Sequence, residues 1–407
     1  MTNALARAMA WVLVTPSMAI AFPTLRFERT AEGFAPKAPS QTVNYTLQKL
    51  DRSAMFWVEV PEGNYKVTLE LTDSTTVKAE TRRLMLRDLN TNHRTAHVHS
   101  FVVNVRTPAL TPPPPNAPGS SAVRLKSREL GQASWDNGLS LEFLPTNKAI
   151  SAIEIEPVTV PTIYLAGDST VTDQTDEPGA SWGQMLPNFF DASVAVANHA
   201  ESGETLKSFL AELRLDKILE TLHAGDWLLI QFGHNDQKAQ WPQTYADAST
   251  TYRSYLRAYI AEARRRGATP ILITSPERRN FNDAGRIVDT LGDYPEAVRT
   301  VAREDSVALI DLHQMSKTFY EALGPDRSRL AFGQQGADRT HHSNYGAYEL
   351  ARMIVLGLQN ADPKLSAGLA SHLAADAGTF DPAHPDDPVN FSLAASSAWT
   401  PALSRSE

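Results

Sequence analysis

From residue 161 onward, short apolar runs alternate with helical segments, and this alternation restricts the fold more than any other feature of the chain. Each run is four to six residues long and carries no charge, as strands buried on both faces require. The runs are residues 162–166, 194–197, 227–232, 270–274 and 307–310. Between two of them, apolar residues recur at helical spacing over residues 251–266. We therefore expect residues 158–360 to form an α/β unit, with helices on both faces of a parallel sheet.

Residues 22–157 show a different pattern, in which apolar and polar residues alternate with a period of two. Residues 57–60 and 65–71 alternate on either side of a Pro-Glu-Gly-Asn turn signal, which predicts a β-hairpin. Further alternating runs are residues 101–105, 139–143 and 153–155. Such strands without a clear helix predict a small antiparallel β-sandwich. Because proline lacks the backbone N–H, the proline-rich residues 107–119 predict an exposed loop within this unit.

The two ends of the chain differ from both units. Residues 1–21 contain the apolar run AMAWVLV and then the small-x-small sequence Ala19-Ile20-Ala21, the layout of a secretory signal peptide. We expect bacterial export to the periplasm or the medium, with a buried N-terminal segment as the alternative. Residues 361–407 are rich in Ala, Asp, Pro and Ser, so we expect a tail that either drapes over the fold or is partly disordered.

Composition excludes several classes of function. The chain has no cysteine, which rules out disulfides, thiolate metal sites and a cysteine nucleophile. The formal net charge of −8 argues against nucleic acid or an anionic membrane as the main partner. No stretch reaches the roughly 20 apolar residues of a membrane span. His, Asp and Glu residues show no metal-ligand spacing, so we expect neither a metal nor another cofactor. The oligomeric state stays open.

Polar residues follow the predicted strands at the edge where parallel sheets bind ligands. Ser169 follows the first run, Gly203 the second and Asn235 the third. Asp338 and His341 stand together shortly before the last helix. A serine hydroxyl needs a neighbouring base, a histidine can take and return its proton, and a carboxylate can orient the ring. These residues predict an acyl-transfer site whose oxyanion is bound by amide N–H groups.

The motifs resemble those of the SGNH, or GDSL, hydrolases over residues 161 to about 358. The matching blocks are Gly167-Asp168-Ser169, Gly203, Gly233-x-Asn235 and Asp338-x-x-His341. The resemblance implies a flavodoxin-like three-layer α/β/α fold and hydrolysis through an acyl-enzyme without a metal. It makes Ser169, Asp338 and His341 the catalytic triad, with His341 rather than His342 as the base. It makes Ser169, Gly203 and Asn235 the donors of the oxyanion hole.

Within that superfamily the chain looks most like the rhamnogalacturonan acetylesterases, which implies deacetylation of a plant polysaccharide such as pectin rhamnogalacturonan. The shared segments include residues 165–171, 233–236 and 338–341. One departure is Glu204, which stands where the family commonly has arginine. An acidic rim there would repel the uronates of pectin, which makes a neutral acetylated xylan a competing substrate. The N-terminal unit, residues 22–157, resembles the galactose-binding-like sandwiches attached to some of these esterases.

Loops after the strands are expected to wall the substrate cleft. Candidate substrate contacts are His234, Trp241, Arg278, Arg279 and Phe281. Aromatic and arginine side chains suit a polysaccharide groove, although an ordinary packed or solvated role is equally expected for each. Asp168 and Asp236 are expected to bond loop N–H groups rather than to act in catalysis.

Two other functions fit the same residues. The first is an esterase or lysophospholipase that acts on lipid esters, because the same triad serves both substrates. The second is a carbohydrate-binding protein whose hydrolase domain is silent. The complete set of triad and oxyanion residues argues against the second.

Overall fold

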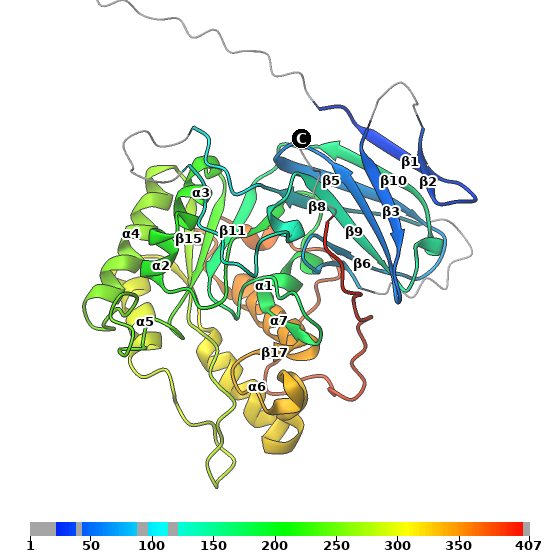
Figure 1. The fold of residues 1–407 in the computed structure, drawn as a ribbon. Coiled ribbons are helices and arrows are strands. Elements are labelled where there is room, and N and C mark those ends of the chain that lie inside the picture. Colours follow the sequence, from blue (N-terminus) through cyan, green and yellow to red (C-terminus); the bar gives the residue numbers. More distant parts are fainter. Residues whose placement is uncertain (1–21, 38–42, 88–96, 113–120, 402–407) are drawn as a thin grey trace, which may run out of the picture.

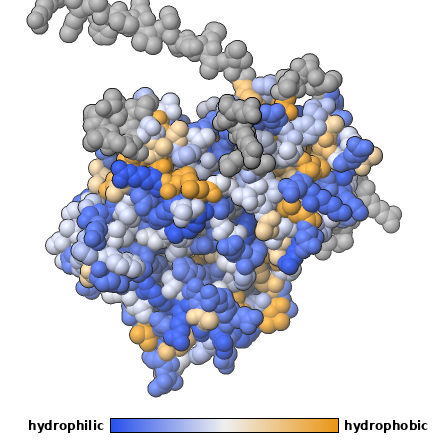
Figure 2. Space-filling model, viewed as in Figure 1, coloured by the Kyte–Doolittle hydropathy of each residue, from blue (hydrophilic) through white to orange (hydrophobic). Residues whose placement is uncertain are grey.

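The structure is a computed structural model that describes residues 22–37, 43–87, 97–112 and 121–401. The expected signal peptide, residues 1–21, lies outside the described residues, and so does most of the proline-rich segment 107–119. None of the described helices is both long and apolar enough to cross a membrane. The face in Figure 2 is largely hydrophilic, with apolar residues in small separate groups.

A parallel sheet forms the centre of the C-terminal half (Figure 1). Its strands are β11 (Thr162–Gly167), β13 (Ala195–Asn198), β14 (Trp227–Gln231), β15 (Thr269–Ile273) and β16 (Ala308–Ile310). Each of the five predicted apolar runs forms one of these strands, with bounds that agree to within one residue. The spatial order β16-β15-β14-β11-β13 is the 2-1-3-4-5 order of flavodoxin-like sheets.

Helices cover both faces of this sheet. One hydrophobic cluster joins it to α1 (Trp182–Met185), α6 (Leu312–Arg327) and α7 (Asn344–Asn360). A second cluster joins the other face to α2 (Leu206–Ala211), α3 (Arg214–Thr221), α4 (Thr251–Arg265) and α5 (Tyr294–Glu304). Neighbouring strand residues such as Leu165 and Ala166 enter different clusters, because successive side chains of a strand point to opposite faces. The expected α/β unit and its helix over residues 251–266 are confirmed.

The N-terminal strands extend the same sheet. Next to β13 lie, in order, β8 (His97–Val105), β5 (Gly63–Leu71), β10 (Ile150–Pro157), β1 (Leu25–Arg29) and β2 (Phe34–Pro36). A second sheet contains, in order, β3 (Tyr45–Lys49), β4 (Ala54–Glu59), β9 (Gly138–Leu144), β6 (Thr76–Ala79) and β7 (Arg83–Leu86). A third hydrophobic cluster contains residues of both sheets, among them Val67 of β5 and Phe56 of β4. One ten-stranded sheet therefore continues from the N-terminal half into the C-terminal half, which the sequence did not predict.

The β-hairpin predicted over residues 57–71 is wrong. Both strands form, but β4 pairs with β3 and β9, whereas β5 pairs with β8 and β10. The chain crosses from one sheet to the other through residues 60–62. A strand that faces a shared core alternates in burial whichever strand it pairs with, so the alternation of residues does not identify the partner.

Short elements connect these layers. They are β12 (Gly179–Ala180), β17 (His342–Ser343), η1 (Ala133–Trp135), η2 (Asn147–Ala149), η3 (Leu186–Phe189), η4 (Ser328–Ala331), η5 (Gln334–Gly336) and η6 (Leu369–His372). After α7, the tail crosses the molecule to the second N-terminal sheet (red in Figure 1). There Trp399 Nε1 donates to Gln48 of β3 at 3.1 Å, and Lys78 of β6 donates to Ser396 Oγ at 2.8 Å. The tail therefore drapes over the fold, one of the two outcomes expected for it.

Candidate active site

Ser169 lies in the turn that follows β11, at the carboxyl end of the parallel sheet. The buried Asp168 carboxylate accepts hydrogen bonds from the N–H and the hydroxyl of Thr170, at 3.0 and 2.9 Å. Gln174 Nε2 donates to the carbonyl of Ser169 at 2.7 Å. Asp168 thus bonds loop N–H groups as expected, and Gln174, which the sequence did not single out, also anchors the turn.

The structure brings Ser169, Asp338 and His341 together. His341 Nε2 lies 2.9 Å from Ser169 Oγ, and His341 Nδ1 lies 2.8 Å from Asp338 Oδ2. The other Asp338 oxygen accepts the backbone N–H groups of Thr340 and His341, at 2.8 and 2.9 Å. Because Nδ1 faces a carboxylate it carries the ring proton, which leaves Nε2 free to accept the proton of Ser169. The three side chains are therefore aligned for proton transfer from the serine.

The carboxylate of Asp338 and the ring of His341 each stabilise the charged form of the other. The hydrogen bond that the Asp338 carboxylate accepts from His341 Nδ1 raises the pKa of His341 above its usual value of 6.5. Burial alone would raise the pKa of Asp338, but the hydrogen bonds from His341 and the loop N–H groups hold it well below its usual range. Asp338 is therefore ionised near neutral pH and can stabilise a protonated ring.

The neighbouring His342 lies in a different environment. It is buried, and its Nε2 is 2.7 Å from the hydroxyl of Tyr320. Burial lowers the pKa of His342 to about 3, so it is neutral over the ordinary pH range. Of the two adjacent histidines, only His341 contacts Ser169.

The three expected oxyanion donors follow three strands. Gly203 comes after β13 and has a φ of +86°, in the left-handed region that favours glycine. Within the described part of the chain, the N–H groups of Ser169 and Gly203 have no hydrogen-bond partner. The side-chain amide of Asn235 donates to the carbonyl of Glu204 at 3.0 Å, which uses one of its two N–H bonds. At all three expected positions the described contacts thus leave an N–H group without a partner.

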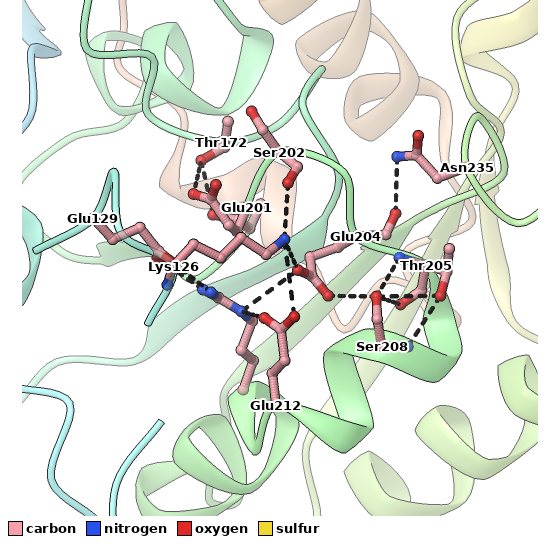
Figure 3. A network of polar contacts seen from close by, with 12 residues as sticks. Lys126, Glu129, Thr172, Glu201, Ser202, Glu204, Thr205, Ser208, Glu212 and Asn235 are labelled. Carbon is pink, nitrogen blue, oxygen red and sulfur yellow. Dashed lines mark hydrogen bonds and ion pairs between the residues drawn. The ribbon is translucent and has the colours of Figure 1, made fainter. Parts of the chain in front are cut away.

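Glu204 does not form an acidic rim, so that expectation is wrong. Its side chain is 0% exposed, pairs with Lys126 and accepts a hydrogen bond from Ser208 Oγ at 2.6 Å (Figure 3). Burial raises the pKa of Glu204 to about 7. Lys126 belongs to the N-terminal half, 78 positions earlier in the chain, so nothing near Glu204 in the sequence indicated this pairing. Because its carboxylate is buried and paired, Glu204 gives no reason to exclude a uronate-containing substrate.

Three of the five candidate substrate residues are engaged in packing. His234 is 3% exposed and its Nε2 donates to the carbonyl of Pro276 at 2.9 Å. Arg278 is partly buried and donates to Thr290 Oγ1 at 3.0 Å. Phe281 packs against the cluster that contains α6 and α7. Each of the three residues therefore has a packing contact within the loops around the site.

The other two candidates lie nearer the surface. Trp241 is 51% exposed, and the ammonium of Lys238 lies 4.8 Å from the centre of its ring. Arg279 Nη2 donates to the carbonyl of Gly336, at 2.6 Å, in the segment that leads to Asp338. Trp241 is the candidate whose ring is most open to a ligand.

Two buried acidic residues organise the surrounding loops. Asp236 Oδ1 accepts the N–H of Leu206 at the start of α2, at 2.9 Å, and burial raises the pKa of Asp236 to about 8. Glu277 accepts the N–H groups of Arg278 and Thr290, at 2.7 and 3.0 Å. Asp236 thus has the structural role expected for it.

Glu277 also lies in a group of side chains of the kind that bind metal ions. One Glu277 carboxylate oxygen lies within 4.8 Å of a carboxylate oxygen of Asp289 and of a ring nitrogen of His313, but the Glu277 carboxylate already accepts hydrogen bonds from the loop.

Comparison with known proteins agrees with this arrangement. A model of the GDSL-like lipase/acylhydrolase family matches residues 165–347, which contain Ser169 and His341. RhgT of Bacillus subtilis (strain 168), a rhamnogalacturonan acetylesterase, is 39% identical over 229 residues, covering 53% of this chain and 95% of that protein. YesY of the same strain, a probable rhamnogalacturonan acetylesterase, is 38% identical over 202 residues, covering 48% of this chain and 92% of that protein.

A crystal structure of YxiM from Bacillus subtilis aligns with 75% of this chain and 80% of its own, at 26% identity and a TM-score of 0.48. RhgT is matched along almost all of its length, and the family model spans the serine, the histidine and the sheet edge between them. The chain therefore belongs to the GDSL-like lipase/acylhydrolase family and is a carboxylic ester hydrolase.

Proposed function

We propose that the protein removes acetyl groups from a plant cell-wall polysaccharide, with Ser169 as the nucleophile. The observation that carries this proposal is the alignment of Ser169 Oγ with His341 Nε2, and of His341 Nδ1 with Asp338. The names of RhgT and YesY favour acetylated rhamnogalacturonan, and the buried position of Glu204 removes the charge objection to it. Acetylated xylan is the competing substrate.

The reaction has two stages. In the first, Ser169 Oγ attacks the acetyl carbonyl while His341 Nε2 takes the serine proton. The N–H groups of Ser169, Gly203 and Asn235 bind the oxyanion, and His341 then gives its proton to the sugar oxygen as the bond from that oxygen to the acetyl carbon breaks. In the second stage His341 takes a proton from water, which attacks the acetyl-enzyme carbonyl. As the bond from the acetyl carbon to Ser169 Oγ breaks, His341 returns that proton to Ser169 Oγ and acetate leaves. Asp338 keeps the ring oriented throughout.

The remaining parts of the chain have proposed roles around this centre. Residues 158–360 form the catalytic domain and residues 361–407 a tail. Residues 22–157 form a galactose-binding-like accessory domain, and residues 1–21 direct export to the periplasm or medium. Trp241 stacks on a sugar ring of the substrate, because its ring is half exposed in the loop that follows Asn235.

Substitution of the serine tests the proposal. Ser169→Ala should abolish release of p-nitrophenol from p-nitrophenyl acetate, while the melting temperature stays that of the wild type. Full residual activity in a folded variant would exclude Ser169 as the nucleophile. The lipid alternative predicts instead that activity on p-nitrophenyl esters rises with acyl chain length, whereas a deacetylase should favour the acetyl ester.

The substrate is identified by measuring acetate released from a panel of acetylated pectins, xylans and mannans. The proposal expects the highest rate on a polysaccharide of the plant cell wall, with rhamnogalacturonan ahead of xylan. No release from any member of the panel, by an enzyme that is active on p-nitrophenyl acetate, would overturn the assignment of a polysaccharide substrate.

A further inference from the structure

A short segment of the N-terminal half, residues 124–129, lies against the loop that carries Gly203 (Figure 3). Lys126 Nζ donates to the carbonyl oxygen of Ser202 at 2.9 Å and pairs with the Glu204 carboxylate. Arg128 Nη2 donates to the same carbonyl, and its Nε donates to Glu201 Oε1 at 2.6 Å. Two cations that come from outside the hydrolase sequence motifs therefore converge on one peptide carbonyl.

That carbonyl belongs to the peptide unit whose N–H is the Gly203 oxyanion donor. A trans peptide is planar, and its C=O and N–H point in opposite directions. Cations that hold the Ser202 oxygen on one side therefore fix the direction of the Gly203 N–H on the other. Hydrogen bonds to the oxygen also polarise the peptide, which makes its N–H a stronger donor.

Gly203 itself gives the loop little rigidity. Its φ of +86° is one that glycine adopts among many others, so the backbone alone does not hold the N–H in place. A Cβ at this position would lie 3.9 Å from Lys126 Nζ, which shows how closely the lysine approaches the glycine. The contacts of Ser202 and Glu204 on either side provide the restraint.

The segment that carries the cations is held firmly. Glu129 accepts the Lys126 N–H at 2.8 Å and forms a buried ion pair with Arg214 of α3, where Arg214 Nη1 lies 2.9 Å from Glu129 Oε1. The Arg124 N–H donates to the carbonyl of Glu212 at 3.0 Å. The two cations therefore project from a fixed base on the catalytic half rather than from a free loop.

We propose that Lys126 and Arg128 are positioning residues of the oxyanion hole, which aim and polarise the Gly203 N–H through the Ser202 carbonyl. This inference rests on the proposed function, because it assumes that the Gly203 N–H binds the oxyanion. The N-terminal half is then part of the catalytic apparatus, and the hydrolase motifs alone do not form a complete site.

Two variants of the full-length protein test it. Arg128→Ala combined with Glu201→Gln removes a cation whose side chain is 54% exposed together with the charge of its buried partner, so the fold should tolerate it. Lys126→Met combined with Glu204→Gln removes both charges of the other pair and leaves no buried carboxylate without its cation. The matched control is Arg124→Ala, because Arg124 is an exposed cation of the same segment whose side chain has no polar contact with a described residue.

On p-nitrophenyl acetate, each test variant should lose about tenfold in kcat with KM changed less than about twofold, since the oxyanion forms only in the transition state. The loss should stay below the roughly 10²–10³ of a deleted donor, because the N–H is misaimed rather than absent. Arg128→Lys should restore part of kcat. The inhibition constant of a boronic acid, which forms a tetrahedral adduct with a nucleophilic serine, should rise by the same factor as kcat falls.

The inference is overturned if both test variants keep kcat within twofold of Arg124→Ala, or if KM alone changes. In that case an inactive Ser169→Ala would leave the proposed function standing. If Ser169→Ala is itself fully active, the proposed function fails first, whatever the cations do.

Discussion

At the scale of single residues, the raised pKa of His341 predicts the pH dependence of the esterase. Only the neutral ring can take the serine proton, so kcat/KM should fall as the pH falls through the pKa of His341. Because Asp338 raises that pKa, the midpoint should lie above 6.5. A pH profile of p-nitrophenyl acetate hydrolysis measures it. Asp338→Asn should move the midpoint down and reduce kcat by up to about 10⁴, as in other triads; an unmoved midpoint would contradict the coupling.

Replacement of His341 by alanine should reduce activity, whereas replacement of the adjacent His342 by alanine should reduce stability. The His341 side chain is 44% exposed, so its loss should leave the melting temperature unchanged while activity falls about a thousandfold or more. His342→Ala opens a buried space and deprives the Tyr320 hydroxyl of its partner, which should cost about 1–3 kcal/mol of stability. Parallel measurements of kcat and thermal unfolding separate the two. Equal loss of kcat in both stable variants would leave the base unassigned.

At the scale of elements, the start of α7 packs against η4 with no room for a side chain. A Cβ on Gly346 would lie 2.0 Å from the backbone oxygen of Ala331, whereas one on Gly357 of the same helix meets the side chain of Ile310. Gly346→Ala should therefore destabilise the protein by about 3 kcal/mol or more, and Gly357→Ala by less. The gain in helix propensity is the same in both variants and cancels. The urea midpoints of the two variants measure this difference. Equal midpoints would contradict the tighter packing at Gly346.

Some strands and their partners could be predicted from the sequence, and others could not. The five central strands could be predicted because burial on both faces leaves an uninterrupted apolar run, as in β14. The partners of β4 and β5 could not, because alternation reports which face is buried and not which strand lies alongside. The grouping of Ser169, Asp338 and His341 was predictable because Ser169 follows β11 and the other two lie shortly before α7, at positions that match the motif blocks of the SGNH hydrolases. Lys126 and Arg128 were not, since a lone cation in a loop shows no pattern until the fold brings it to Ser202.

At the scale of the whole molecule, the halves of the chain are joined through more than the shared sheet. The ten-stranded sheet links them along β8 and β13, while the ion pairs of Glu129 and Glu204 link them beside the candidate active site. A protein joined in this way should unfold in one step, because neither half keeps its contacts when the other is lost. Its stability should then depend on single residues that contact several parts at once.

Glu177 is such a residue, and it predicts an acid-sensitive contribution to stability. Its carboxylate contacts Arg82 at 2.7 Å, Lys78 at 3.2 Å, the Ser396 N–H at 3.0 Å and Asn344 at 2.7 Å, which joins the second N-terminal sheet, the tail and α7. Burial opposes its ionisation, but Arg82 and Lys78 lower its pKa from 4.5 to about 2. A lowered carboxyl pKa stabilises the fold above the unfolded value, near pH 4.5, and this stabilisation disappears as the pH falls towards 2. Glu177→Gln should therefore cost up to about 3 kcal/mol at pH 7 and almost nothing near pH 2, in urea unfolding followed at both pH values. A difference that stays constant over this range would mean that the charge of Glu177 does not hold the halves together.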